Sequence, residues 1–213
     1  QLWLNQDLAG MGWPLRPDNG EEPVLSGFTE PFDTWASLTH LLKMEDWQGV
    51  QPKNASYFCS ALPVEHYPPA SETGFQAHKT LIAKAGAIGQ LDNQIYKLWD
   101  NVPAPGSQSA ATTGGFPWQW LHDASDATGV ARFDSQYWRA NVDPSERYVM
   151  SVKGSTQYRV DTDGTGIDNL YVTGDWIKTG INASCVEAAT MAGMQTSRAI
   201  CGYPEVIKGE KDF

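Results

Sequence analysis

The sequence has only three cysteines, Cys59, Cys185 and Cys201, and no two of them have C-x-x-C spacing. An odd number of widely separated cysteines argues against a disulfide framework and against a zinc site. Because free thiols persist in reducing compartments, we expect a cytoplasmic protein.

The sequence also lacks a cluster of basic residues, and its formal net charge is −10. Nucleic acids are bound chiefly by lysines and arginines that contact phosphates, so we expect no nucleic-acid partner. We see no apolar run long enough to span a bilayer and no signal-peptide pattern. The chain begins at Gln1 without a methionine, which indicates a processed product, a fragment or the second chain of a split protein.

A complete dinucleotide fingerprint, G-x-G-x-x-G between a strand and a helix, is absent as well. Gly10-Met11-Gly12 and Gly164-Thr165-Gly166 each supply G-x-G without the third glycine. Asp161-Thr162-Asp163-Gly164 resembles the start of a calcium loop, but position twelve is Val172 where the loop needs a glutamate. We therefore predict a turn between strands there and no metal site.

The chain has 213 residues, enough for one large domain or two small ones, and 41% of them are hydrophobic. Nine tryptophans, eight tyrosines and seven phenylalanines indicate either large packed surfaces or an apolar substrate cavity, and core packing is the favoured interpretation. Of the four histidines only His66, in a proline-rich loop, is of interest as a site residue, and a structural role is favoured for it as well.

Local patterns predict strands, helices and strands again, without an internal repeat. Helices are predicted at 33–42 and 71–98, a helical turn at 118–123, and a flexible surface segment at 103–115. Gly86 and Gly89 weaken the middle of 71–98, so two shorter helices are the alternative there. Strands are predicted at 1–4, 24–28, 54–62, 131–141, 147–152 and 157–160.

The segment Asn169–Gly202 reads as a short strand, an acidic turn, a loop of small residues and a helix. Leu170 to Thr173 is β-prone and stops at Gly174-Asp175, as a parallel strand does when it delivers a carboxylate to its carboxyl end. Ser184 to Glu187 fits the capping box, so a helix is expected to begin near Ser184. A mostly small face suited to close packing against a sheet is formed by Val186, Ala189, Gly193, Ser197 and Ile200.

This segment offers a place for a polar cofactor. A carboxylate at a strand end accepts hydrogen bonds from ribose or ribitol hydroxyls, and a helix N-terminus presents unpaired amides with a partial positive charge. An ordinary β-α unit with a capped helix explains the same pattern about equally well.

The residues Gly174-Asp175-Trp176, followed by Gly180, Asn182, Glu187 and Gly193, resemble the C-terminal flavin-binding segment of FAD-dependent amine oxidases and carotenoid-desaturase-type proteins, including phytoene and squalene-type enzymes. The resemblance implies FAD as cofactor, with Asp175 at the ribitol or phosphate and the amides of Asn182–Val186 near the flavin ring. The cofactor-binding residues it implies are Gly174, Asp175, Trp176, Asn182, Ala183, Ser184, Cys185 and Val186.

The same resemblance implies a mixed α/β (α+β) fold, the C-terminal part of a two-domain FAD-binding oxidoreductase. Residues 1–160 would belong to a mixed-sheet substrate-binding domain, and residues 161–213 would be the closing β-α segment of the FAD domain. In this family the missing glycine fingerprint binds the ADP half of FAD. We therefore expect a second polypeptide, or a lost N-terminal half, that carries it.

The expected reaction is oxidation of a small apolar substrate by hydride transfer to flavin, with no side chain identified as catalytic. Cys185 stands where amine oxidases of the family place an aromatic residue, which favours desaturase-like or dehydrogenase-like chemistry. The alternatives are an amine or amino-acid oxidase subunit that produces hydrogen peroxide, a non-catalytic partner subunit of a flavoprotein, and a standalone binding module.

Overall fold

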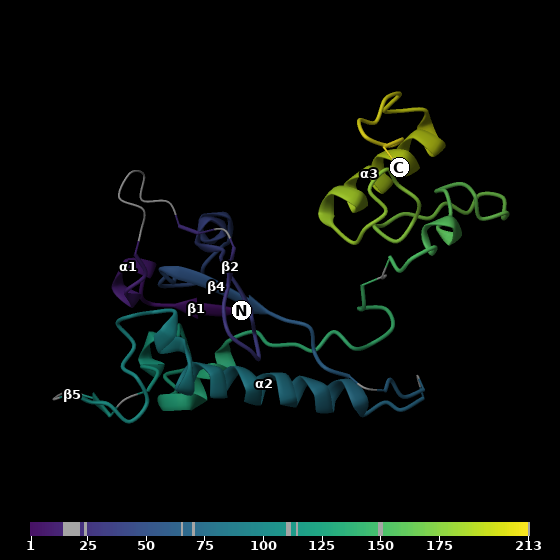
Figure 1. Ribbon diagram of the computed structural model, residues 1–213. Helices are drawn as coiled ribbons and strands as arrows, with labels where there is room; N and C mark the ends of the chain where they lie inside the picture. The colour runs from purple at the N-terminus through teal and green to yellow at the C-terminus, as the bar shows by residue number, and fades with distance from the viewer. Residues whose placement is uncertain are drawn as a thin grey trace. The chain divides into compact units, whose positions relative to one another are not determined.

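The computed structural model describes residues 1–14, 22–23, 25–64, 66–69, 71–109, 112–113, 115–148 and 151–212. The chain divides into two compact units, Gln1–Asp143 and Pro144–Phe213, each described by itself (Figure 1). This division lies earlier than the predicted boundary after residue 160. The assignment of a substrate domain and an FAD segment to the two sides of that boundary stays a prediction.

An antiparallel sheet of four strands organises the first unit, in the order β1-β4-β3-β2. Its strands are β1 (Leu2–Leu4), β2 (Ser26–Gly27), β3 (Thr34–Ser37) and β4 (Asn54–Cys59). The strands predicted at 1–4 and 54–62 are confirmed, and β2 lies inside the strand predicted at 24–28, of which Val24 is outside the described residues.

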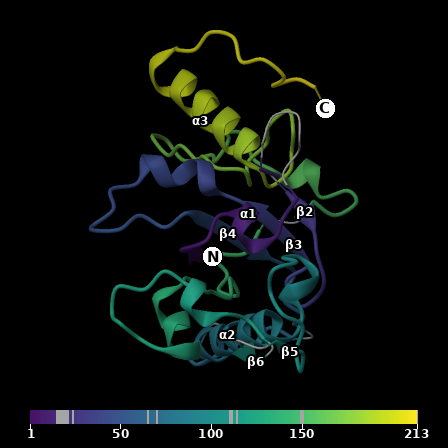
Figure 2. The same cartoon turned by 90° about the vertical axis from the view of Figure 1, so that its left-hand side faces the viewer.

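One face of this sheet packs on the hydrophobic core. Leu2 and Leu4 pair with Ser56 and Asn54, so all four side chains share a face, and Leu4 is fully buried. The long helix α2 (Phe75–Asn93) runs along that face (Figures 1 and 2). The buried core residues are Leu2, Leu4, Leu8, Met11, Trp35, Leu91, Ile95, Leu98, Trp99, Val102, Phe116, Leu121 and Phe133.

The polar residues of β4 are buried without being left unpaired. The Trp35 indole Nε1 donates to Ser56 Oγ at 3.1 Å, and Ser56 Oγ donates to Asn54 Oδ1 at 2.7 Å. The Asn54 amide then donates to Thr39 Oγ1 at 2.7 Å. Because buried polar groups are costly unless they are hydrogen-bonded, this chain of bonds fixes the register of β3 and β4.

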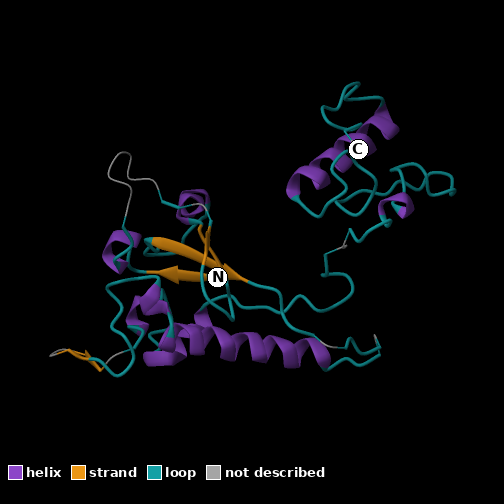
Figure 3. Ribbon diagram, in the orientation of Figure 1, coloured by secondary structure: helices purple, strands orange, loops and turns teal. Residues whose placement is uncertain are grey.

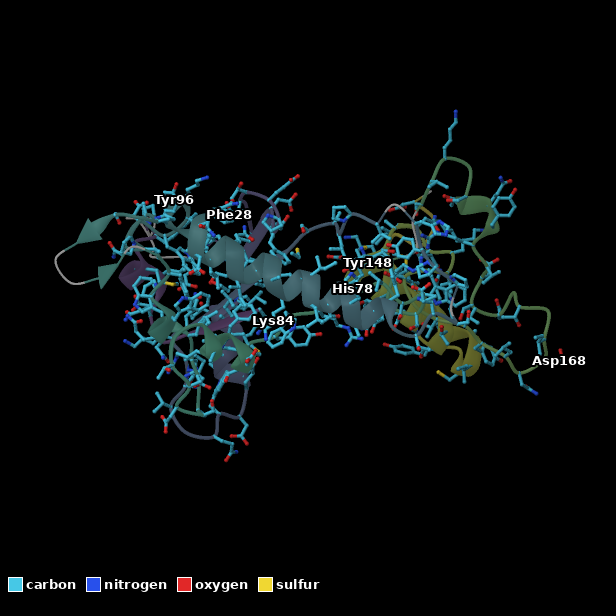
Figure 4. The ribbon with its side chains drawn as sticks, turned by 90° about the horizontal axis from the view of Figure 1, so that it is seen from below. Phe28, His78, Lys84, Tyr96, Tyr148 and Asp168 are labelled. Carbon is cyan, nitrogen blue, oxygen red and sulfur yellow. The ribbon has the colours of Figure 1, made fainter. Side chains whose placement is uncertain are left out.

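Helix α2 confirms the helix predicted within 71–98, and the 3₁₀ helix η2 (Ile95–Lys97) extends it. Gln90 is buried on it and ties the helix to the loop before β3, with Nε2 donating to the carbonyls of Thr29 (2.8 Å) and Phe32 (3.1 Å). On the same helix Lys84 lies 4.6 Å above the Trp138 ring and pairs with Asp134 (Figure 4). Both contacts hold α2 to the rest of the first unit.

The helix predicted at 33–42 is wrong. Thr34–Ser37 forms β3, and the following residues form a 3₁₀ helix, η1 (Thr39–Met44). The apolar spacing that suggested a helix spans both elements. Ladder pairing of Thr34 with Cys59 and of Ser37 with Ser56 outweighs that local pattern, because it satisfies the backbone of a strand that is buried on both faces.

The strands predicted at 131–141, 147–152 and 157–160 are also wrong for the residues described. The first begins inside a 3₁₀ helix, η4 (Gly129–Ser135), where Arg132 donates to the carbonyls of Leu121 and Ala127. Residues 149 and 150 of the second are outside the described residues, and the rest of it is irregular. The third is largely the 3₁₀ helix η5 (Thr156–Tyr158). Aromatic and β-branched composition favoured strands, but no ladder partner is available to them in the described chain.

The remaining elements of the first unit are short. They are α1 (Leu8–Met11), the hairpin of β5 (Gln108–Ser109) and β6 (Thr112–Thr113), and η3 (Trp118–Trp120). The helical turn predicted at 118–123 is confirmed as η3. The surface segment predicted at 103–115 contains the hairpin, and its residues 110, 111 and 114 lie outside the described residues.

The second unit consists of loops around η5 and one long helix, α3 (Val186–Cys201) (Figure 3). The strand predicted at 170–173 is extended chain without a ladder. Val172 donates its N–H to the Thr162 carbonyl at 2.9 Å, and Thr162 Oγ1 donates back to the Val172 carbonyl at 2.7 Å. Over the described parts of the chain, no helix is long and apolar enough to cross a membrane.

The four-stranded antiparallel sheet and the helices α2 and α3 together confirm the coarse expectation of a mixed α and β fold.

Candidate functional site

The turn at Gly174 has a backbone that only glycine adopts readily. Its φ is +120°, and a Cβ at this position would lie 2.9 Å from the Trp176 ring. Asp175 follows with a half-buried side chain, and its carboxylate makes no hydrogen bond or ion pair with any described residue. The turn therefore presents a carboxylate that no described residue binds, and its contact with a cofactor stays a prediction.

Arg159 holds this turn in place. Its Nη1 donates to the carbonyl oxygens of Asp175 at 2.7 Å and Ile177 at 3.1 Å, and its Nη2 donates to Ser151 Oγ at 2.9 Å. The Ser151 hydroxyl in turn donates to the Asn182 carbonyl at 2.6 Å. One guanidinium thus links the acidic turn to the loop that precedes α3.

That loop, Thr179–Asn182, is closed by its own side chains. The Asn182 side chain accepts from the Thr179 amide at 3.0 Å, while Thr179 Oγ1 accepts from the amides of Ile181 (3.3 Å) and Asn182 (3.1 Å). Asn182 adopts φ 52°, which asparagine tolerates better than most residues. Both residues are buried, so these hydrogen bonds are shielded from solvent and restrain the loop.

Gly180 allows the C-terminal segment to pack on the loop. A Cβ on it would lie 1.7 Å from the Gly209 carbonyl oxygen, and its own amide approaches Met191 Sδ on α3 at 3.2 Å. The segment that carries Gly209 is anchored to α3 by Arg198, whose Nη1 donates to Glu210 at 2.9 Å. This bidentate pair lowers the pKa of the Glu210 carboxyl and raises that of the Arg198 guanidinium.

Helix α3 begins one residue later than the capping box predicts. Cys185 is the N-cap, and its Sγ accepts from the Ala188 amide at 3.4 Å. Extended backbone at Cys185 (φ −157°) lets the thiol take the place of a serine hydroxyl. The amides of Val186 and Glu187 have no carbonyl partner within the helix, so this end presents donors and partial positive charge.

The predicted packing face of α3 is the exposed one. Val186 is 79% exposed and Ile200 is 62% exposed, and Ala189 and Gly193 also face solvent. The buried residues are Ala188, Met191 and Ala192 on a neighbouring stripe. Loops of Pro144–Phe213 cover that stripe, and the described part of this unit supplies no sheet for the small-residue face to pack against.

The structure therefore joins the predicted site residues through side chains that the sequence pattern did not identify, namely Ser151, Arg159, Thr179 and Met191. The hydrogen bonds of Ser151, Arg159 and Met191 join residues 8 to 31 positions apart, and those of Thr179 lie within its own loop, but none belongs to the motif that was recognised. The backbone N–H of Asn182 already donates to Thr179 Oγ1, so it stabilises the loop and is not free to bind a cofactor. The backbone amides at the start of α3 remain available for the predicted contact with a flavin ring. Trp176 lies beside the turn and is 41% exposed.

The chemistry of the site fits FAD in kind. Asp175 offers an acceptor to hydroxyl groups, and the start of α3 offers donors and positive potential to an electron-rich ring edge. Phosphate-binding glycines are absent from the sequence, so these residues fit one part of the cofactor. Among the described residues no group of histidine, cysteine or carboxylate side chains is arranged to hold a metal ion, and all three cysteines are free.

No protein-family model matches this chain, and neither a curated protein nor a solved structure is significantly similar to it. The resemblance to FAD-dependent oxidoreductases thus rests on the residues between Gly174 and Gly193.

Proposed function

We propose that this chain is the C-terminal portion of an FAD-dependent oxidoreductase, in which a second polypeptide or an N-terminal half supplies the glycine-rich dinucleotide-binding part. The observation that carries the proposal is the linkage of two predicted cofactor contacts. Arg159 and Ser151 tie the backbone of the Asp175 turn to the loop that leads into α3.

The uncommitted Asp175 carboxylate supports this role. A half-buried carboxylate that no described residue pairs with is suited to accept hydroxyl donors from a ligand. Its backbone is fixed by Arg159 and by the turn at Gly174, so little ordering is required on binding.

An exposed apolar face and an unpaired backbone segment of the second unit support the proposal that a further, glycine-rich part packs against it. The α3 face of Val186, Ala189, Gly193 and Ile200 is apolar, small and exposed, as expected of a helix that packs on a sheet lying outside the second unit. The extended segment 170–173 lacks a ladder neighbour among the described residues, and a parallel neighbour from the glycine-rich part would satisfy its backbone.

When bound, FAD would supply the hydride acceptor. The contribution of this chain would be to orient the cofactor through Asp175 and to stabilise negative charge on the ring through the first-turn amides of α3. Asp175 would act as a hydrogen-bond acceptor, and no proton transfer is assigned to a side chain of this unit.

The engagement of Cys185 as the N-cap supports desaturase-like or dehydrogenase-like chemistry over amine oxidation. Its thiol is directed to the Ala188 amide and provides no aromatic wall for an amine. An amine or amino-acid oxidase remains the alternative reaction, and hydrogen peroxide release on a panel of amines distinguishes it.

The test is the visible absorbance of the protein purified under native conditions, together with a gel that shows which chains accompany it. A yellow assembly with a second chain, reducible by substrate, supports the proposal. A colourless chain that gains no flavin in the presence of every accompanying polypeptide contradicts it. A yellow assembly that no substrate reduces would favour the non-catalytic partner subunit.

A further inference from the structure

A second candidate site lies wholly within the first unit, on the face of the sheet opposite the core. It is a cavity of about 480 Å³, and the residues of its lining that bear on its chemistry are Trp3, Trp47, His122, Asp123, Ser125 and Ser135. None of these residues belongs to the predicted cofactor set. The cavity is therefore independent of the predicted cofactor contacts.

Three aromatic rings, those of Trp3, Trp47 and His122, line it and form an aromatic corner. The Trp3 and Trp47 ring centroids are 6.4 Å apart at 73°, and those of Trp47 and His122 are 5.9 Å apart at 85°. Two tryptophan rings and one histidine ring therefore contribute surface to the cavity. Cations bind over the faces of aromatic rings, and tryptophan is the strongest of the aromatic partners.

The aromatic residues of the cavity are held in place by backbone and side-chain hydrogen bonds. The His122 amide donates to the Trp3 carbonyl at 2.8 Å, which pairs this segment with the edge of β1. The side chain of the buried Gln136 bridges the same two residues, accepting from the Trp3 amide at 2.8 Å and donating to the His122 carbonyl at 2.8 Å. Trp47 is fixed by its own Nε1, which donates to the Leu42 carbonyl at 3.0 Å. The corner is thus pre-organised.

The polar groups of the lining offer acceptors. Asn5 donates through its amide to the carbonyls of Gln119 and Leu121, so its Oδ1 must accept from His122 Nδ1 at 3.0 Å. Because Nδ1 is engaged with Asn5, Nε2 is the ring nitrogen left for a ligand. The hydroxyls of Ser125 and Ser135 both donate to the Asp123 carboxylate, so toward a ligand they offer only lone pairs.

The lining contains one acidic side chain, that of Asp123. The Asp123 side chain is fully buried, and no lysine or arginine is among the described residues of the lining. The guanidinium of Arg132 lies behind it, 3.9 Å from the carboxylate, and is committed to backbone carbonyls. Sixteen of the 25 acidic residues and eight of the 15 basic ones lie within Gln1–Asp143, so the field of the whole unit attracts cations as well.

We propose that this cavity binds a small organic ammonium ion that carries at least one N–H, such as a protonated alkylamine. The alkyl part would lie against Trp3 and Trp47, and the ammonium hydrogens would be donated to His122 Nε2 and the serine oxygens. A quaternary ammonium ion would use the rings alone and bind more weakly. A neutral polyol would forgo the attraction to the rings.

The test is an NMR titration of the full chain that follows the indole N–H signals of Trp3 and Trp47. The probes are n-butylammonium, tetramethylammonium, n-butanol and methyl β-glucoside. The expected result is saturable binding of n-butylammonium, weaker binding of tetramethylammonium and no binding of the two neutral probes. Equal or tighter binding of n-butanol or the glucoside, or no binding of either cation, overturns the proposal.

Trp47→Leu should weaken n-butylammonium binding by about fivefold to tenfold, since a partly desolvated cation–π contact contributes that much. The matched control is Tyr158→Leu, which removes an exposed aromatic side chain from the second unit and should leave binding unchanged. Nuclear Overhauser contacts between the butyl protons and both indole rings in the unaltered protein test the geometry without a variant. Their absence on saturation, or an unchanged affinity in a folded Trp47→Leu, also overturns the proposal.

Discussion

Gly180, in the loop before α3, lies directly against the backbone of Gly209 in the C-terminal segment. A Cβ on Gly180 would lie 1.7 Å from the Gly209 carbonyl oxygen and 2.7 Å from its carbonyl carbon. Because both are backbone atoms, no side-chain rotation relieves the overlap. The loop before α3 and the C-terminal segment therefore pack in this way only with glycine at position 180.

Gly180→Ala should destabilise the second unit by about 2 kcal/mol or more, because the segments must separate to admit the methyl group. Urea denaturation of the full chain, followed by circular dichroism, measures the change. Gly193→Ala is the matched control. Nothing lies within 4 Å of a Cβ at that helical position, so alanine should stabilise the protein by about 0.5–1 kcal/mol. Equal effects of the two variants would show that the Gly180 contact is absent.

Arg159→Ala should loosen the Asp175 turn, because it removes hydrogen bonds to two carbonyls and to Ser151 at once. The expected cost is about 2 kcal/mol, as for other hydrogen bonds of charged groups. Amide hydrogen exchange across 174–182 should accelerate, while Lys208→Ala, an exposed site without such contacts, should leave it unchanged. Unaltered exchange in the arginine variant would refute the clamp.

Cys185→Ser should preserve or slightly raise stability, because a hydroxyl is the better N-cap acceptor for the Ala188 amide. Cys185→Ala leaves that amide without its acceptor and should be less stable than the serine variant by about 1 kcal/mol. Thermal denaturation of the two variants measures the difference. Indistinguishable melting would mean that position 185 does not cap α3.

Asp123→Asn should lower stability at neutral pH and remove part of its acid dependence. Hydrogen bonds from the Ser135 hydroxyl first, and then from Ser125 and the Ala127 amide, hold the pKa of the Asp123 carboxyl well below its usual range. A carboxyl whose folded pKa is depressed contributes stability above its unfolded pKa, about 3.9, and loses it as pH falls toward the folded pKa. Urea denaturation between neutral pH and about pH 2 tests this. Asp46→Asn, at an exposed position, should leave the profile unchanged.

Elements with one strong local signal were predicted from the sequence. Helix α2 has apolar residues every three or four positions, and Gly86 and Gly89 do not interrupt it because tertiary packing outweighs their low propensity. The strand at Asn54 was recognisable by its composition. Residues 33–42 were misassigned because their partners, Ser56 to Cys59, are distant in sequence and no local pattern encodes the ladder.

The sequence predicted the turn and the helix of the candidate site but not the side chains that hold them in place. The Gly174-Asp175 turn and the helix after it are local features, and both are present. Arg159 was missed because it lies 16 residues before the Asp175 carbonyl that it binds. The face of α3 was misassigned because helical spacing gives two adjacent apolar stripes, and the stripe of Met191 is the one that the loops of this unit cover.

The aromatic corner illustrates the same limit. Composition indicated abundant tryptophan without showing that Trp3 and Trp47 would meet His122, which was not among the histidines of interest. These residues are brought together because the His122 amide donates to the Trp3 carbonyl, 119 residues away in the sequence. Antiparallel contacts of such long range leave no periodic trace in a sequence.

The most direct test of the flavin site is the FAD affinity of the natively purified assembly with Asp175→Asn, compared with Asp168→Asn, an exposed carboxylate of the same unit (Figure 4). Loss of a charged acceptor for cofactor hydroxyls should weaken binding by about tenfold or more in Asp175→Asn. Asp168→Asn should bind FAD as the unaltered assembly does. Equal affinities in the two variants would contradict the assignment of Asp175 and the α3 N-terminus to a flavin.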